Sequence, residues 1–287
     1  MEYQTLNNGL QIPKLGLGVF QIWNPQECQE IVEQALACGY RAIDTAAVYY
    51  NEAAVGQALR TSGVPRKEIT LTSKLWLTDA SYEGAKRAFA RSTERLGTDY
   101  LDVFLIHQPY GDYFGAWRAM GELYQTGQVK AIGVSNFSAG RLTDLILAAK
   151  IPPAINQIEL HPYRQAHLQR QAGELADVIT EAWSPFHQGR DGIFQDLVLH
   201  KIAAAHQKTV AQVILRWQTQ QGLITIPKSV HLERMQENLA IFDFRLSSAE
   251  MAAIAELDQV PDSNGPDEST ELVQRLHQIN PDQPRTD

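Results

Sequence analysis

Four side chains of different chemistry stand at or just beyond the ends of short apolar runs: Asp44, Tyr49, Lys74 and His107. A tyrosine hydroxyl ordinarily loses its proton near pH ~10, but a nearby ammonium favours the phenolate and makes the phenol a usable acid at neutral pH. Asp44 would keep Lys74 charged and oriented, and His107 would hydrogen-bond a carbonyl. The set suits protonation of a carbonyl oxygen while a hydride reaches the carbon. Since no side chain supplies a hydride, it also predicts a redox cofactor.

The elements that must bring these four residues together are strand-like apolar runs, which alternate with longer amphipathic stretches. The pattern predicts strands at 15–19, 41–44, 69–74, 101–107, 129–134, 154–159, 178–183 and 223–226. It predicts helices at 26–38, 52–61, 81–96, 114–125, 139–149, 165–172, 196–206, 210–220 and 232–239. The near-continuous apolar strands are typical of a parallel sheet that is buried on both faces.

Eight strand–helix units in a chain of this length predict an α/β protein with a single (β/α)₈ TIM barrel. A doubly wound sheet would need a glycine-rich nucleotide fingerprint after its first strand, and Gly16-Leu17-Gly18 lies within the strand and lacks the third glycine. Because catalytic groups gather at the carboxyl ends of barrel strands, the four residues are expected to converge at one rim.

The two ends of the chain extend this barrel. Segments 3–6 and 10–13 flank Asn7-Asn8-Gly9, which predicts an N-terminal β-hairpin placed to close the barrel floor. From residue 258 the composition turns to Pro, Asp, Ser and Gln, with a short helix expected at 270–279. We therefore expect one domain, 1–257, comprising the barrel and its hairpin, followed by a polar C-terminal tail, 258–287.

Several segments together resemble the motifs of the aldo-keto reductases. Residues 44–56 read Asp-Thr-Ala-Ala-Val-Tyr-Tyr-Asn-Glu-Ala-Ala-Val-Gly, and 72–76 read Thr-Ser-Lys-Leu-Trp. Residues 105–107, 133–137 and 226–229 supply Leu-Ile-His, Gly-Val-Ser-Asn-Phe and Ile-Pro-Lys-Ser. The resemblance runs from about residue 6 to 257, and the pattern is similar to bacterial members that reduce small aldehydes, ketones and keto sugars.

This resemblance implies an enzyme, an NADP(H)-dependent oxidoreductase that reduces small carbonyl compounds to alcohols. It implies Tyr49 as the proton donor, assisted by Lys74 and Asp44, with His107 orienting the carbonyl. It also implies a set of NADPH/NADP⁺ contacts. Ser135, Asn136 and Gln157 would hold the nicotinamide carboxamide, Trp183 would stack on its ring, Lys228, Ser229 and Arg234 would bind the 2′-phosphate, and Glu237 and Asn238 would lie near the adenine. Two cations and a hydroxyl at one phosphate favour NADPH over NADH.

The expected substrate pocket contains two departures from the family pattern. Gln108 follows the catalytic histidine, where the family often has an aromatic residue, and Phe20 stands where many members have a tryptophan. With Val48 and Trp76 they complete the predicted pocket. Both changes bear on specificity and leave the reaction class unchanged.

Composition and charge exclude other classes. The net charge is −8, with 25 Lys and Arg against 33 Asp and Glu and no basic cluster, so a nucleic-acid partner is not expected. No apolar run approaches the ~20 residues of a membrane span, and no signal peptide is visible. Cys28 and Cys38 form no disulfide framework, which favours the cytoplasm. His161 and His167 do not have the spacing of metal ligands, so no metal is expected. The resemblance to the family also implies a monomer.

Two other functions remain open on the sequence. Barrels of this family also serve as cofactor-binding regulatory or structural subunits, although the complete set of four polar residues argues against that. A Schiff-base lyase would use Lys74 as a covalent amine and would need no nicotinamide contacts.

Overall fold

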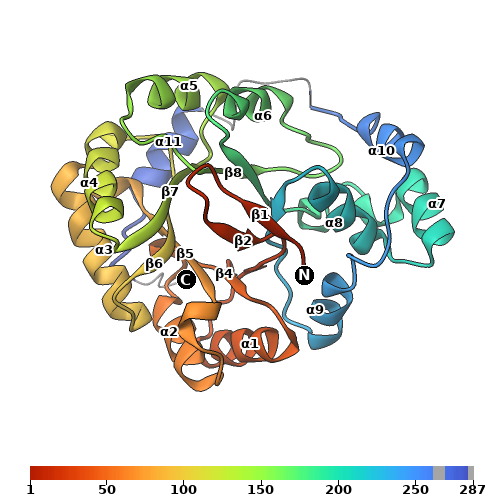
Figure 1. Ribbon diagram of the computed structural model, residues 1–287, viewed down its shortest axis with the longest axis horizontal. Helices are drawn as coiled ribbons and strands as arrows, with labels where there is room; N and C mark the ends of the chain where they lie inside the picture. The colour runs from red at the N-terminus through yellow and green to blue at the C-terminus, as the bar shows by residue number, and fades with distance from the viewer. Residues whose placement is uncertain (261–268, 284–287) are drawn as a thin grey trace.

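The computed structural model describes residues 1–260 and 269–283 of the chain. Eight parallel strands lie side by side in chain order (Figure 1). They are β3 (Leu17–Gly18), β4 (Ala42–Asp44), β5 (Thr70–Leu75), β6 (Leu101–Ile106), β7 (Val129–Ser135), β8 (Ile155–Glu159), β9 (Ile179–Trp183) and β10 (Ile224–Thr225). The amides of Gly16 and Thr225 donate to the carbonyls of Thr225 and Lys14, each at 2.9 Å, so the first and last strands meet. The predicted (β/α)₈ barrel is confirmed.

Helices surround the strands. They are α1 (Pro25–Cys38), α2 (Glu52–Thr61), α3 (Tyr82–Leu96), α4 (Tyr113–Gln125), α5 (Ala139–Ala148), α6 (His167–Glu174), α7 (Leu197–His206), α8 (Val210–Gln220), α9 (Leu232–Leu239), α10 (Ser248–Ala255) and α11 (Thr270–His277). Helix α3 shows how local chemistry sets their ends: the Ser81 hydroxyl accepts from the Gly84 amide, and Gly97 ends the helix at φ 64°. Helix α10 was not predicted, because its short and largely apolar sequence shows little helical periodicity.

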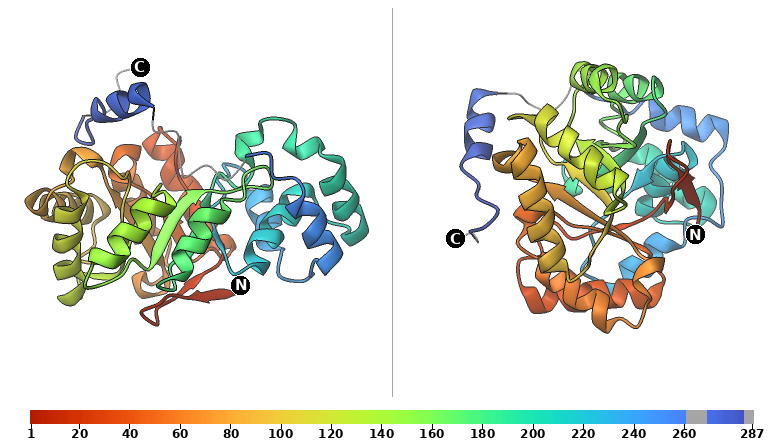
Figure 2. Two further views of the ribbon diagram at one scale, coloured as in Figure 1. Left: turned by 90° about the horizontal axis from the view of Figure 1, so that it is seen from above. Right: turned by 60° about the vertical axis from the view of Figure 1, so that its left-hand side comes forward.

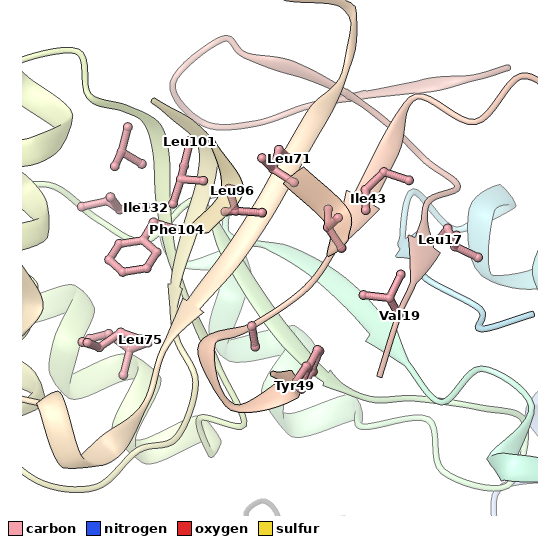
Figure 3. Close-up of a cluster of buried hydrophobic side chains, with 14 of the residues drawn as sticks. Leu17, Val19, Ile43, Tyr49, Leu71, Leu75, Leu96, Leu101, Phe104 and Ile132 are labelled. Carbon is pink, nitrogen blue, oxygen red and sulfur yellow. The ribbon is translucent and has the colours of Figure 1, made fainter. Parts of the chain in front are cut away.

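The core has two layers, since side chains alternate between the two faces of each strand. Leu17, Ile43 and Leu71 are register partners on three neighbouring strands and are buried in the large core cluster (Figure 3). A separate cluster contains Val103, Leu105, Ala131, Ile155 and Ile224 from β6, β7, β8 and β10, together with Leu6 and Ile12.

Leu6 and Ile12 come from the N-terminal hairpin, in which β1 (Tyr3–Thr5) pairs with β2 (Gln11–Pro13) in the antiparallel direction. They pack on the second cluster and close the barrel floor, as expected from the sequence. Helix α11 lies at the opposite end of the barrel from this hairpin (Figure 2).

The C-terminal segment contains the short helix that was expected at 270–279, which the structure shows as α11. Beyond α11, the Ile279 carbonyl accepts from Trp76 Nε1 at 3.0 Å and the Asn280 carbonyl accepts from Tyr50 Oη at 2.9 Å. Asp282 pairs with Arg95 at 2.6 Å. Residues 270–283 are therefore held across the rim at which the four polar residues were expected. The rest of the predicted tail, 261–268 and 284–287, lies outside the described residues.

Within 1–260 and 269–283, none of the helices combines the length and the apolar character needed to cross a membrane.

Candidate active site

The alternation of side chains along each strand explains why polar groups gather at one end of the barrel. Lys74 lies near the carboxyl end of β5, and Gln157 on β8 pairs with Glu181 on β9. Closer to the amino ends of their strands, Val103 on β6 and Ile155 on β8 belong to the apolar cluster. The barrel interior therefore changes from apolar to polar toward the carboxyl ends of the strands.

Lys74 is the centre of the polar set. Its side chain has no solvent exposure, and its ammonium lies 2.5 Å from Asp44 Oδ1 and 3.3 Å from Tyr49 Oη. Burial by itself would lower the pKa of Lys74, but the adjacent Asp44 carboxylate raises it above its ordinary value. The amine is therefore held as an ammonium ion beside the phenol.

Tyr49 lies in a 3₁₀ turn, Ala47–Tyr49, directly after β4. Buried Asn51 fixes this turn: its Oδ1 accepts from Thr45 Oγ1 at 2.7 Å, and its Nδ2 donates to the Val19 carbonyl at 2.9 Å. Burial raises the pKa of Tyr49, and Lys74 opposes that rise without cancelling it. The phenol therefore keeps its proton at neutral pH, which is the form that a proton donor requires.

His107 completes the set predicted from the sequence. Its ring centroid lies 5.6 Å from that of Tyr49 and 5.1 Å from that of Trp76. Burial, reinforced by the charge of Lys74, holds the pKa of His107 well below 6.5. The imidazole is neutral at physiological pH, so it can donate a hydrogen bond to a ligand but is a poor source of a whole proton.

Sequence reasoning missed Glu181. Gln157 Nε2 donates to Asp44 Oδ2 at 2.8 Å and to Glu181 Oε1 at 2.9 Å, which joins two buried carboxyl groups. Burial, followed by the nearby Asp44, raises the pKa of Glu181 to about 8. A glutamate within a buried strand was the available signal, because such residues are rarely buried without a partner.

Four residues of the predicted cofactor set are joined by hydrogen bonds. Asn136 has a left-handed backbone, φ 61°, and its Nδ2 donates to the His107 carbonyl at 3.1 Å. Its Oδ1 accepts from Trp183 Nε1 at 3.0 Å. The Ser135 hydroxyl donates to the Gln157 carbonyl at 2.9 Å. These contacts fix the orientation of the Trp183 indole next to the polar set.

A cavity of about 1720 Å³ opens over these groups, which exceeds the ~300–1,000 Å³ of most small-molecule sites. Most of the residues predicted for the site line it. They are Phe20, Asp44, Val48, Tyr49, Trp76, His107, Gln108, Ser135, Asn136, Gln157, Trp183, Lys228 and Arg234. The cavity therefore brings the predicted proton donor, cofactor contacts and substrate pocket together.

Four predicted residues lie outside this lining. Lys74 is buried behind Tyr49, and the Ser229 hydroxyl is engaged with the backbone of His231. Glu237 Oε1 accepts from Thr209 Oγ1 at 2.6 Å, and Asn238 is buried. The structure thus places Glu237 and Asn238 in contacts of their own, away from the cavity wall.

The C-terminal segment also lines the cavity, which sequence reasoning did not foresee. Arg275, Leu276 and Ile279 contribute to the wall on the same side as Trp76 and Tyr50. The Phe20 ring also lines the cavity, lies 4.9 Å from the ring of Tyr49 and is 44% exposed. Phe20 and the C-terminal segment therefore both border the cavity that Tyr49 lines.

The sequence of this chain is similar to those of known proteins. A family model described as "Aldo/keto reductase family" matches residues 14–191 and 195–259. A curated relative, glyoxal reductase of Bacillus subtilis, is 47% identical over 255 residues, which cover 88% of this chain and 92% of the relative.

Two solved structures are similar throughout. The aldo/keto reductase from Brucella melitensis superposes with a TM-score of 0.86 at 46% identity, covering 90% of this chain and 99% of its own. A variant of Gox0644 in complex with NADPH superposes with a TM-score of 0.85 at 40% identity, covering 90% of this chain and 93% of its own.

Proposed function

Because this chain belongs to the aldo/keto reductase family, we propose that it is an NADPH-dependent oxidoreductase that reduces small aldehydes and ketones to alcohols. One observation carries the proposal: a protonated, buried Tyr49 faces a large cavity with the Lys74 ammonium 3.3 Å behind its hydroxyl and neutral His107 beside it. This arrangement suits the transfer of a proton to a carbonyl oxygen.

The residues present fit such a cofactor. Lys228 and Arg234 line the cavity, and neither has an ion-pair partner among residues 1–260 and 269–283. Two such cations suit the 2′-phosphate that distinguishes NADPH from NADH. The Ser229 hydroxyl donates to the His231 carbonyl, so it would have to leave that carbonyl to bind the phosphate. When bound, NADPH supplies the hydride that reaches the carbonyl carbon.

The chain's own residues perform the remaining chemistry. Tyr49 donates its proton to the carbonyl oxygen as the hydride adds to the carbon, which yields an alcohol and a transient tyrosinate. The Lys74 ammonium stabilises that tyrosinate, and Asp44 holds Lys74 in place. His107 would direct the carbonyl oxygen toward Tyr49 with a hydrogen bond. Phe20, Val48, Trp76 and Gln108 would surround the substrate.

At the nicotinamide, we propose Trp183 as the stacking surface and Ser135, Asn136 and Gln157 as the polar wall. Both hydrogens of the Gln157 amide already bind carboxyl groups, so its Oε1 is the atom left to meet a carboxamide. The Asn136 amide is likewise engaged on both sides, which supports a positioning role for it. Glu237 and Asn238 would reach an adenine only after a shift of α9.

Small carbonyl compounds are the proposed substrates, with glyoxal as the first to test and keto sugars next. The relative named glyoxal reductase supports this order. The short distance between Phe20 and Tyr49 also supports a narrow approach to the proton donor.

Replacing Tyr49 by Phe tests the proposal. The variant lacks only the acidic hydroxyl, so kcat for glyoxal reduction should fall by roughly 10²- to 10⁴-fold, while the Kd for NADPH stays within about twofold. Turnover is followed by the loss of NADPH absorbance, and binding by the quenching of tryptophan fluorescence. A wild-type chain that oxidises no NADPH with any carbonyl, or a Tyr49→Phe chain that keeps full activity, would refute the mechanism.

The lyase alternative is disfavoured by the environment of Lys74. Schiff-base formation needs a neutral and accessible amine. Lys74 is fully buried, and Asp44 raises its pKa. Borohydride in the presence of glyoxal should therefore leave no reduced adduct on Lys74.

A further inference from the structure

A second group of chemically reactive side chains lies beside the cavity and takes no part in the proposed reaction. It consists of Glu159 at the end of β8, His161 two residues later, and His187 in the loop after β9. One potential ligand atom from each of the three lies within 4.8 Å of the other two. We call these residues the Glu159 cluster.

His161 is the most buried member of the cluster. Its side chain is only 2% exposed, yet neither Nδ1 nor Nε2 has a hydrogen-bond partner among the residues that the structure describes. Glu159 Oε1 is 3.7 Å from His161 Nε2 and 4.0 Å from His187 Nδ1, both beyond hydrogen-bonding distance. Buried polar atoms usually have a hydrogen-bond partner, so an unpartnered imidazole beside a carboxylate is a place where a metal ion could bind.

We propose that Glu159, His161 and His187 bind a divalent transition-metal ion, with Zn²⁺ as the best-matched example. Two imidazoles and one carboxylate suit zinc, nickel or copper better than magnesium or calcium, which prefer oxygen ligands alone. Tetrahedral zinc with bonds of ~2.0–2.2 Å separates its ligand atoms by about 3.4 Å. The gaps of 3.7 and 4.0 Å to Glu159 are close to this separation. The rings of His161 and His187, whose centroids are 4.2 Å apart, would have to turn apart for both to bind one ion.

Asp191 supplies the outer support that such sites use. Its Oδ2 lies 2.8 Å from His187 Nε2, so the proton of a neutral ring resides on Nε2 and the lone pair of Nδ1 faces Glu159. Histidine ligands of metals commonly donate their other N–H to a carboxylate in this way. Arg164 is the neighbouring cation that opposes metal binding, and the Glu159 carboxylate offsets it.

A bound ion would link β8 to the loop that follows β9. Phe186, Gln188 and Arg190 of that loop line the cavity, so the metal would brace part of its wall. Glu159 and His187 remain partly exposed, which leaves a route for the ion from solvent. The proposal does not depend on the identity of the carbonyl substrate or the cofactor.

Calorimetric titration of chelator-treated protein with ZnCl₂ tests the site. A Cys38→Ser background removes the less buried of the two thiols as a competing ligand. We expect one ion per chain, and Co²⁺ should give the intense visible bands of a tetrahedral site. His187→Ala should weaken the affinity by more than 100-fold, and Asp191→Asn by about 10- to 100-fold.

His167→Ala is the matched control, because His167 is exposed and its ring lies beside Asp258, outside the Glu159 cluster. It should leave both the stoichiometry and the affinity unchanged. Glu159→Gln preserves side-chain size and should also weaken Zn²⁺ binding, so the proposal stays testable even if His187→Ala disturbs the loop. Absence of stoichiometric binding, or binding that survives both His187→Ala and Glu159→Gln unchanged, would overturn it.

Discussion

At the scale of single residues, the candidate site is a buried network with one ammonium and two carboxyl groups. Asp44 forms the ion pair with Lys74, while the Glu181 carboxyl accepts a hydrogen bond from the amide of Gln157. A second buried negative charge would lack a compensating cation, which is why Glu181 holds its proton more tightly than an exposed glutamate. Glu181 therefore makes the network sensitive to pH without contacting the phenol.

Replacing Glu181 by Gln should expose this sensitivity. The pKa of Glu181 is about 8 in the folded protein and 4.5 ordinarily, so the folded state binds the proton more tightly. The stabilisation from that proton is complete below pH ~4.5 and is lost as the pH rises toward ~8. Glutamine cannot titrate. The free energy of unfolding of the wild type, relative to Glu181→Gln, should therefore fall from pH 5 to pH 8 and level off above it.

Urea unfolding at each pH measures this difference. Glu233→Gln is a matched control, since Glu233 is exposed on α9 and its replacement should give no such trend. A difference between wild type and Glu181→Gln that is independent of pH would contradict the assignment of a raised pKa to Glu181.

At the scale of elements, the sequence predicted the strands and the position of each polar group at a strand end. The run 101–107 matches β6, Leu101–Ile106, and His107 follows it. Such predictions succeed because burial on both faces leaves a local record in the apolar pattern. Contacts between distant elements leave no such record in the sequence. His161 and His187 come from different loops, and the spacing of His161 to His167 gave no sign that His187 lies beside it.

The C-terminal segment was harder to predict for a related reason. Trp76 and Tyr50 bind it through the backbone carbonyls of Ile279 and Asn280, which every sequence offers. The side chain of Asp282 pairs with the barrel, through Arg91 at 3.2 Å and Arg95 at 2.6 Å. Polar composition therefore indicated a tail and gave no sign that the tail covers the cavity.

Replacing Asp282 by Asn should loosen this cover. Partly exposed ion pairs are each worth up to about 1 kcal/mol, so we expect the KM for glyoxal to rise by a few-fold with little change in kcat. Limited proteolysis should also cut the segment sooner than in the wild type. Glu271→Gln, on the exposed face of α11, is the control. If the KM and the rate of proteolysis both match those of the control, Asp282 does not anchor the segment.

At the scale of the whole molecule, the charge around the cavity is opposite in sign to the net charge of the chain. The net charge is −8, yet Arg190, Lys228, Arg234 and Arg275 all line the cavity. The acidic residue in the lining is Asp44, which is paired with Lys74. A screened surface charge acts over roughly 8 Å at physiological ionic strength, so an anionic ligand in the cavity meets these local cations rather than the average charge.

The proposed preference for NADPH over NADH would follow from this local charge. Replacing Lys228 and Arg234 together by Ala should remove two charge-assisted contacts to the 2′-phosphate, each worth roughly 1.5–3 kcal/mol. The ratio of kcat/KM for NADPH to that for NADH should then fall at least tenfold, mainly through the KM for NADPH, while the NADH reaction changes little. Lys201→Ala, exposed on α7, controls for the loss of positive charge as such. A wild type that prefers NADH, or a double variant in which kcat/KM falls equally for both cofactors, would show that these cations do not bind the 2′-phosphate.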